Sequence, residues 1–148
     1  MITLHTYTEQ KIANEQQRQE IIAFLFHHLE QYGDPKSDIE KAINYAMGED
    51  NKPGGILLTA IDDSTGALAG VLVINKTGMH SYIPENILVY IATDKNLRGK
   101  GIGKKLMQHA IEISNGDIAL HCEPDNPAKH LYEKLGFTSK YLEMRLKK

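Results

Sequence analysis

A glycine-rich segment, Arg98-Gly99-Lys100-Gly101-Ile102-Gly103, combines backbone freedom with positive charge. Glycine lets the main chain approach a ligand closely and turn several N–H groups toward it. The segment lies between a β-rich run that ends near Thr93 and an apolar pattern typical of a helix, whose N-terminus would add further donors. Lys104 and Lys105 follow directly. These residue types at this spacing predict a site for a phosphate-bearing ligand.

Two common nucleotide-binding motifs do not fit this segment. A Walker A loop built on Gly103 would need glycine at Arg98 and serine or threonine at Lys105. A dinucleotide fingerprint would need glycine at Lys104 or at Leu106, depending on where the count begins. What remains is an arginine-x-x-glycine-x-glycine pattern.

A second segment, which starts at Asn126, reads asparagine-x5-tyrosine-x3-glycine-phenylalanine and contains Tyr132, Gly136 and Phe137. With the glycine-rich segment before it, this part of the chain resembles the GNAT superfamily of acyltransferases. The resemblance covers about residues 56–146. It implies a fold in which two central strands splay apart and the pantetheine arm of acetyl-CoA lies in the gap like an added strand.

Acetyl-CoA is therefore the expected cosubstrate, and no metal is expected. The resemblance places the donor on a strand end, on the glycine-rich segment with the start of the next helix, and on the second segment. The implied donor-binding residues are Ile91, Ala92, Thr93, Arg98, Gly99, Lys100, Gly101, Ile102, Gly103, Lys104, Asn126 and Lys129.

The implied reaction is transfer of an acetyl group to a primary amine by direct attack. It needs a deprotonated amine, a donor for the developing oxyanion and an acid for the departing thiolate. The resemblance implies that Tyr132 is this acid; the alternative is a core tyrosine on an amphipathic helix. A different function also stays open, an acetyl-CoA-binding regulatory or sensor module without catalysis, because no carboxylate lies between Ile87 and Thr93.

The general base is less clearly indicated. Glu85 is a candidate because, counted without gaps back from Arg98, it falls where the histone-acetylating branch of the family carries its glutamate. A bulge in the strand would spoil that register. The alternatives are a surface role for Glu85, a base that acts through water, or no dedicated base. Tyr90 is a weaker candidate because a phenol has an ordinary pKa of about 10.

The acceptor is expected to be a small-molecule or peptide amine. Family topology suggests Tyr32 and Asp34, in a turn between two helices, as acceptor-binding residues, together with Tyr90 and His121; for His121 ordinary packing or solvation is the alternative. The balance of 19 acidic against 17 basic residues favours a cationic amine without identifying it.

Hydrophobic periodicity and turn residues predict the elements that carry these side chains. Ser37 with Glu40 is read as a capping box, and Asn126 with Pro127 as the N-cap and first position of the last helix. Gly136 is read as the glycine that ends this helix. The predicted strands are 2–7, 56–61, 67–74, 87–93, 117–122 and 137–146, and the predicted helices are 19–32, 37–46, 101–114 and 126–136.

This order, β-α-α-β-β-β-α-β-α-β, predicts an α/β fold with a mixed sheet and splayed central strands. The 148 residues suit one domain over 1–148. A net charge of −2 argues against a nucleic-acid partner, and no apolar run has the length of a membrane span. With no signal peptide and one cysteine, a cytoplasmic protein is expected. Homodimerisation is frequent in the family, and the sequence does not decide it.

Overall fold

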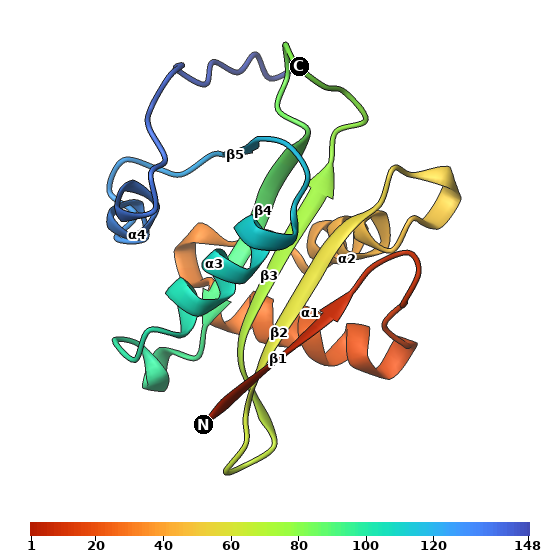
Figure 1. The fold of residues 1–148 in the computed structure, drawn as a ribbon, viewed down its shortest axis with the longest axis vertical. Coiled ribbons are helices and arrows are strands. Elements are labelled where there is room, and N and C mark those ends of the chain that lie inside the picture. The colour runs from red at the N-terminus through yellow and green to blue at the C-terminus, as the bar shows by residue number, and fades with distance from the viewer.

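The sheet is mixed and has helices on both faces in a computed structural model that describes residues 1–148 (Figure 1). Its strands lie in sequence order, with β1 to β4 antiparallel and β5 joined to β4 in parallel. They are β1 (Ile2–Tyr7), β2 (Gly55–Asp62), β3 (Ala67–Lys76), β4 (Asn86–Thr93) and β5 (Ile118–Leu120). The predicted fold class is confirmed.

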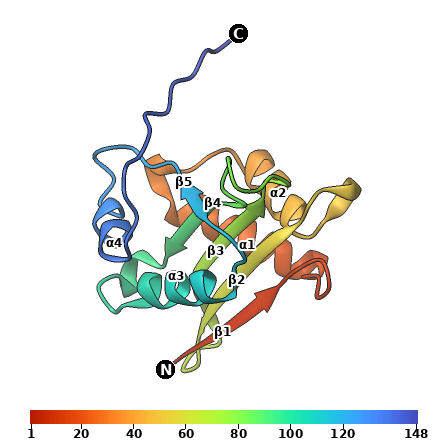
Figure 2. The same cartoon turned by 45° about the horizontal axis from the view of Figure 1, so that its top comes forward.

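The helices form two layers that sandwich the sheet (Figure 2). Helices α1 (Glu15–His28) and α2 (Lys36–Ala46) cover one face, and α3 (Ile102–Ile113) and α4 (Lys129–Lys134) cover the other. The short 3-10 helices are η1 (Glu30–Tyr32), η2 (Glu49–Asn51) and η3 (Lys95–Leu97). None of the helices combines the length and the apolar character that crossing a membrane requires.

Two apolar cores hold these layers together. On β3, Val71 and Val73 point into a cluster of 13 buried residues under α1 and α2. Leu72 and Ile74 point the other way, into a cluster of 12 under α3 and α4. A strand covered on both faces is apolar at consecutive positions, which explains the unbroken apolar runs read from the sequence.

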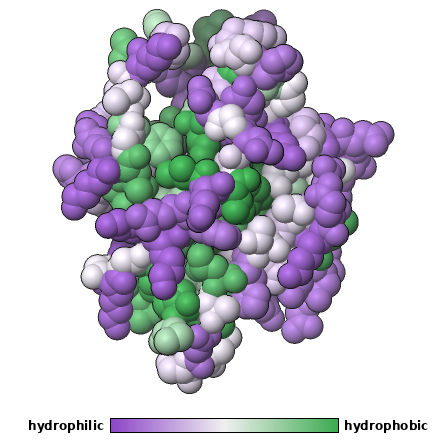
Figure 3. Space-filling view, viewed as in Figure 1, coloured by the Kyte–Doolittle hydropathy of each residue, from purple (hydrophilic) through white to green (hydrophobic).

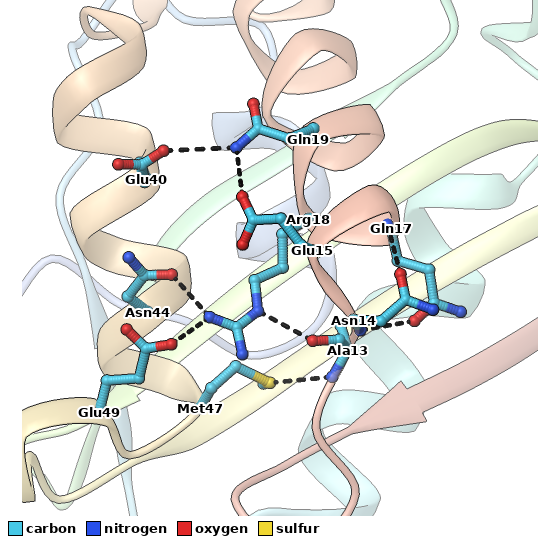
Figure 4. Close-up of polar contacts among 10 residues, drawn as sticks. All are labelled: Ala13, Asn14, Glu15, Gln17, Arg18, Gln19, Glu40, Asn44, Met47 and Glu49. Carbon is cyan, nitrogen blue, oxygen red and sulfur yellow. Dashed lines mark hydrogen bonds and ion pairs between the residues drawn. The ribbon is translucent and has the colours of Figure 1, made fainter.

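Helix α1 starts earlier than the predicted Gln19. Asn14 caps it: the Asn14 carboxamide oxygen accepts from the Gln17 N–H at 2.8 Å, and the Gln17 side chain accepts from the Asn14 N–H at 2.8 Å (Figure 4). This reciprocal arrangement is a capping box. It uses asparagine and glutamine, whereas the capping box predicted at residues 37–40 has serine and glutamate.

The predicted capping box of Ser37 and Glu40 is wrong. Helix α2 starts at Lys36 with Pro35 in the cap position, so Ser37 already lies within the first turn and caps nothing. What fixes α2 is its apolar face and a contact with α1. The Arg18 guanidinium donates to the Ala13 carbonyl at 2.9 Å and to the Asn44 carboxamide at 3.0 Å, and it pairs with Glu49 (Figure 4).

The predicted closing strand, residues 137–146, is not formed. The chain beyond Phe137 makes no backbone hydrogen bonds and leaves the body of the molecule as an extended segment (Figure 2). The apolar alternation that suggested a strand stays at the surface, with Tyr141, Leu142, Met144 and Leu146 each 80–89% exposed. Alternation of apolar and polar residues indicates only that a segment tends to be extended. To form a strand, the segment must also pair with the edge of a sheet.

Candidate active site

The site is built around the divergence of β4 from β5. The parallel pairing ends at Leu88 and Leu120, whereas β4 continues to Thr93. Beyond Leu88, β4 therefore has a partner on its β3 side only. In Figure 1 β5 turns away from β4 toward α4. This is the splay that was expected between the strand ending at Thr93 and the one near Cys122.

A β-bulge lies at the mouth of the splay. Ile74 pairs with Leu88 and Val73 pairs with Tyr90, so Val89 is the extra residue on β4. As a result the consecutive side chains of Val89 and Tyr90 both pack against the core under α1 and α2. The bulge bends the strand just where its far edge becomes unpaired. The bulge also invalidates the ungapped count from Arg98 that made Glu85 a candidate for the general base.

The glycine-rich segment forms an open cradle at the start of α3. Gly99 and Gly101 adopt left-handed backbone angles, with φ of +82° and +77°, and a Cβ on either would meet nothing within 4 Å. None of the backbone N–H groups of residues 98–104 donates a hydrogen bond within the protein. Unpaired donors at a helix N-terminus suit an anion. The cradle thus has the donor set that a pyrophosphate would use.

Close packing fixes the cradle relative to the sheet. A Cβ at Gly70 on β3 would lie 2.8 Å from the Leu106 side chain and 3.0 Å from that of Ile102, so only glycine lets α3 come this near. Ile102 is 4% exposed and is a core residue. Only its backbone is therefore available to a bound phosphate-bearing ligand. Gly103 lies beside Thr93 and Leu131, whose side chains would be 3.7 and 3.5 Å from a Cβ there.

The basic residues and the strand residues predicted to bind acetyl-CoA range from exposed to buried. Lys100 and Lys104 are exposed, and Lys129 is half-buried at the start of α4. The Arg98 guanidinium lies against the end of α1, where it pairs with Glu30. Of the strand residues, Ile91 packs toward α3 and α4, and Ala92 is buried on the opposite face.

Tyr132 is buried on α4, with 8% of its surface exposed. Its hydroxyl makes no hydrogen bond to another protein group. Burial, and after it the nearby Cys122 thiol, raises the pKa of Tyr132 to about 12. The phenol therefore stays protonated at neutral pH and is available as a donor. Cys122 is half-buried in the segment after β5.

The residues after Tyr132 hold its helix in place. The Phe137 N–H donates to the Tyr132 carbonyl at 3.0 Å and the Gly136 N–H to the Glu133 carbonyl at 3.1 Å, with Gly136 at φ +101°. This is a Schellman motif, and Gly136 ends the helix as predicted. The Phe137 ring packs against the Tyr132 ring with centroids 6.0 Å apart. The glycine-phenylalanine pair thus positions the tyrosine.

Asn126 has a different role from the predicted N-cap. The helix starts at Lys129 with Ala128 in the cap position. The Asn126 carboxamide oxygen accepts from the Ala128 N–H at 2.9 Å, which forms a side-chain turn ahead of the helix. Pro127 consequently lies before the helix. Asn126 is half-buried, near the end of the β5–α4 connection.

The predicted acceptor residues on α1–α2 and β4 are brought together. The Tyr90 hydroxyl donates to the Asp34 carboxylate at 2.6 Å, and the Tyr32 hydroxyl donates to the Asp125 carbonyl at 3.4 Å. Burial, followed by the hydrogen bond to Asp34, raises the pKa of Tyr90 far above its ordinary value. His121 is exposed and makes no hydrogen bond. No group of three or more His, Cys, Asp or Glu side chains converges as a metal site would require.

Glu85 is not brought to this site. It precedes β4, and its carboxylate accepts from the N–H groups of Asp117 at 2.8 Å and Ser81 at 3.1 Å. Those hydrogen bonds hold the pKa of the Glu85 carboxyl below its usual range. At about 3.3 Å per residue, β4 separates Glu85 from Thr93 by roughly 25 Å. The geometry does not support Glu85 as a base and gives it a structural role at the paired end of β4 and β5.

The acetyltransferase (GNAT) family model matches residues 12–137. The chain therefore belongs to the GNAT acetyltransferase family. No curated protein sequence matches it significantly.

Solved structures show the same fold at low sequence identity. A transcriptional regulator from Bacillus halodurans is 19% identical with a TM-score of 0.71, and the match covers 99% of each chain. A histone acetyltransferase HPA2 and related acetyltransferase from Corynebacterium glutamicum is 20% identical, with a TM-score of 0.67 over 97% of this chain and 89% of that one. A ribosomal-protein-alanine N-acetyltransferase from Brucella melitensis is 18% identical, with a TM-score of 0.64 over 99% of each chain.

Proposed function

We propose that this protein transfers an acetyl group from acetyl-CoA to a primary amine by direct attack, with Tyr132 as the acid for the departing thiolate. The observation that carries the proposal is the continuity of the site. The unpaired edge of β4 connects the N–H cradle of residues 98–104 to the region lined by α4. Helix α4 lies beside the cradle through Leu131, whose side chain is next to Gly103. It lies near the segment after β5 through Tyr132, whose pKa is raised in part by the Cys122 thiol.

The residues present fit acetyl-CoA as the donor. Its pyrophosphate would take the N–H groups of residues 98–104, with Lys104 and Lys129 as neighbouring cations. Its pantetheine would add to the β4 edge at Ile91 and Thr93, as peptides add to exposed strands. Asn126, which is half-buried near the end of the β5–α4 connection, would contact the pantetheine. Figure 3 shows hydrophobic surface in the region of α3 and α4. Partly buried apolar residues that pack against the core under these helices include Ile91, Leu120, Cys122, Ala128 and Leu131.

Acetyl-CoA would supply an activated acyl carbon, and the chain would supply donors and orientation. A backbone N–H of β4 beyond the bulge at Val89 would donate to the carbonyl oxygen as negative charge develops there. The C–N bond forms, the C–S bond breaks, and the Tyr132 hydroxyl gives its proton to the sulfur. The nitrogen that has attacked loses a second proton as the amide forms, and this proton returns to Tyr132 through water, which restores the acid. No covalent enzyme intermediate is needed.

No side chain is proposed as a dedicated base. The raised pKa of Tyr90 keeps its phenol protonated, so it cannot accept a proton near neutral pH. Glu85 is held elsewhere by backbone donors. The amine therefore loses its proton to water before it attacks. The rate should then rise with pH until the free amine predominates, with a midpoint that follows the pKa of the chosen amine.

Asp34 is proposed to hold the acceptor. Its exposed carboxylate is oriented by Tyr90 and lies in the same turn as Tyr32. A second amino group on a cationic acceptor would pair with it, which leaves the reacting amine free. This agrees with the slight acidic excess of the chain, 19 acidic against 17 basic residues.

The test is thiol release from acetyl-CoA by the full chain across a panel of diamines, polyamines, aminoglycosides and peptides. Product mass identifies the acetylated amine. Cys122 is the only cysteine and sets a constant background in a thiol assay. Turnover on at least one cationic amine supports the proposal. Tight acetyl-CoA binding without turnover on any amine would instead favour a sensor module.

A further inference from the structure

Arg98 is engaged with the end of α1. One guanidinium nitrogen, Nη2, donates to the His28 carbonyl at 3.0 Å and lies 3.0 Å from the Glu30 carboxylate. The same corner holds a second contact, from the Lys95 N–H to His28 Nδ1 at 3.3 Å. The loop that leads into the N–H cradle is thus fastened to the point where α1 ends.

Glu30 holds an uncommon backbone conformation. Its φ is +55°, in the left-handed region that residues other than glycine rarely adopt. Such a conformation persists when surrounding contacts impose it. The ion pair with Arg98 is one such contact, and Glu30 is the first residue of η1.

The turn that starts at Glu30 continues to the acceptor side of the site. Tyr32 reaches the Asp125 carbonyl at 3.4 Å and Asp34 accepts from Tyr90 at 2.6 Å. One short segment, residues 28–34, therefore contacts the glycine-rich loop at one end and carries the proposed amine-binding residues Tyr32 and Asp34 at the other. A change in the Arg98–Glu30 contact would be felt by both.

We propose that Glu30 is a positioning residue that couples donor binding to the placement of the α1–α2 turn. The inference rests on the proposed function, because it takes the pyrophosphate of coenzyme A to be the anion at the cradle. Arg98 lies in the loop where that anion would sit, and Glu30 competes with it for the guanidinium. Without the Glu30 charge, the donor binds more tightly, while the turn loses a contact that holds Tyr32 and Asp34. The two effects have opposite signs.

The measurement is the Kd of coenzyme A by calorimetry for the wild type and for Glu30→Gln, which removes the charge and keeps the size. Glu20→Gln is the control, because Glu20 is an exposed α1 residue that changes the net charge equally. We expect Glu30→Gln to bind about 2–5-fold more tightly, in the range of an exposed ion pair. The gain should shrink at high ionic strength, and Glu20→Gln should match the wild type.

Two further readouts separate coupling from a general structural effect. Glu30→Gln should raise the KM for the amine about 2–5-fold with kcat within about 2-fold, and hydrogen exchange should rise in residues 28–34. In an Arg98→Gln background, Glu30→Gln should no longer change the Kd. If Glu30→Gln binds coenzyme A no more tightly than Glu20→Gln while the wild type binds, the inference alone is wrong. If the wild type does not bind coenzyme A, the proposed function fails with it.

Discussion

The Tyr90 hydroxyl lies 2.6 Å from an oxygen of the Asp34 carboxylate and joins the bulged strand β4 to the α1–α2 turn. Tyr90 points this way because Val89 is an extra residue in β4. Asp34 remains an exposed residue despite this hydrogen bond. A carboxylate that is oriented from one side and open on the other is suited to a cationic amine.

Asp34→Asn should weaken acceptor binding. Loss of one charge-assisted contact corresponds to roughly a tenfold rise in KM for a cationic amine, with little change in the Kd of coenzyme A. Asp34→Glu, which restores the charge, should recover part of the loss. Steady-state kinetics on the best amine from the panel give both numbers. An unchanged KM in Asp34→Asn would remove Asp34 from the acceptor site.

Tyr132→Phe should reduce kcat by about 10²–10⁴-fold, the usual range for loss of a general acid. Coenzyme A affinity should change little, because the ring and its contact with Phe137 are kept. Tyr82→Phe is the matched control, since Tyr82 is 81% exposed and lies far along the chain from α4. Equal turnover by the two variants would show that the Tyr132 hydroxyl is not the acid.

The raised pKa of Tyr132 also predicts how stability changes in alkali. The unfolded chain ionises this phenol near its ordinary pKa of 10.0, whereas the folded chain keeps the proton up to about 12. Rising pH between those values therefore favours the unfolded state. The free energy of unfolding of the wild type, minus that of Tyr132→Phe, should be constant below pH 10 and fall above it. Ultraviolet titration of tyrosinate should show one late-ionising tyrosine fewer in Tyr132→Phe than in the wild type, because Tyr90 ionises late in both proteins.

Gly101→Ala tests the cradle, and Gly66→Ala provides a matched control. Both glycines have positive φ, +77° and +74°, and at both a Cβ would meet nothing within 4 Å. Each alanine should cost about 1 kcal/mol of stability through backbone strain. Only Gly101→Ala should weaken coenzyme A binding, because Gly66 lies in the β2–β3 turn. Equal affinities in the two variants would argue against a pyrophosphate at residues 98–104.

Glu85→Gln should leave turnover within about 3-fold of the wild type, against the loss of about 10²-fold or more expected for a base. The lowered pKa of Glu85 means that its charge stabilises the fold above the ordinary carboxyl pKa of 4.5. That contribution disappears as the pH falls through the folded pKa. Urea unfolding should therefore find Glu85→Gln less stable than the wild type at neutral pH, with the two converging in acid.

Local sequence patterns were enough to predict the parts of the site whose structure depends on neighbouring residues alone. The glycine-rich segment, the strand before it and Gly136 at the end of α4 were all predicted, because left-handed turns and helix ends have direct residue preferences. The same logic failed at Ser37 and Glu40, where the cap position is held by Pro35, two residues before Ser37. Pattern matching cannot rank one capping residue above another when both are suitable.

The remaining errors arise from pairings across the sheet. The bulge at Val89 depends on how β3 and β4 align, which no property of β4 alone reveals. Glu85 was selected by a count that ignored that register. The segment after Phe137 alternates as a strand would, yet it finds no edge with which to pair. Contacts between distant segments, such as Arg98 with Glu30, had no signal in the sequence at all.

The short ladder between β4 and β5 has a consequence for folding as well as for binding. Three residue pairs, from Asn86–Ile118 to Leu88–Leu120, are all that hydrogen-bond β5 to the rest of the sheet. A donor lying against the open edge would extend this ladder, so the ligand would act as a missing piece of secondary structure. Among the hydrogen-bonded parts of the sheet and the helices, residues 118–137 should then exchange amide hydrogens early in the free protein and gain protection when coenzyme A is added, since a ligand that binds only the folded form stabilises it.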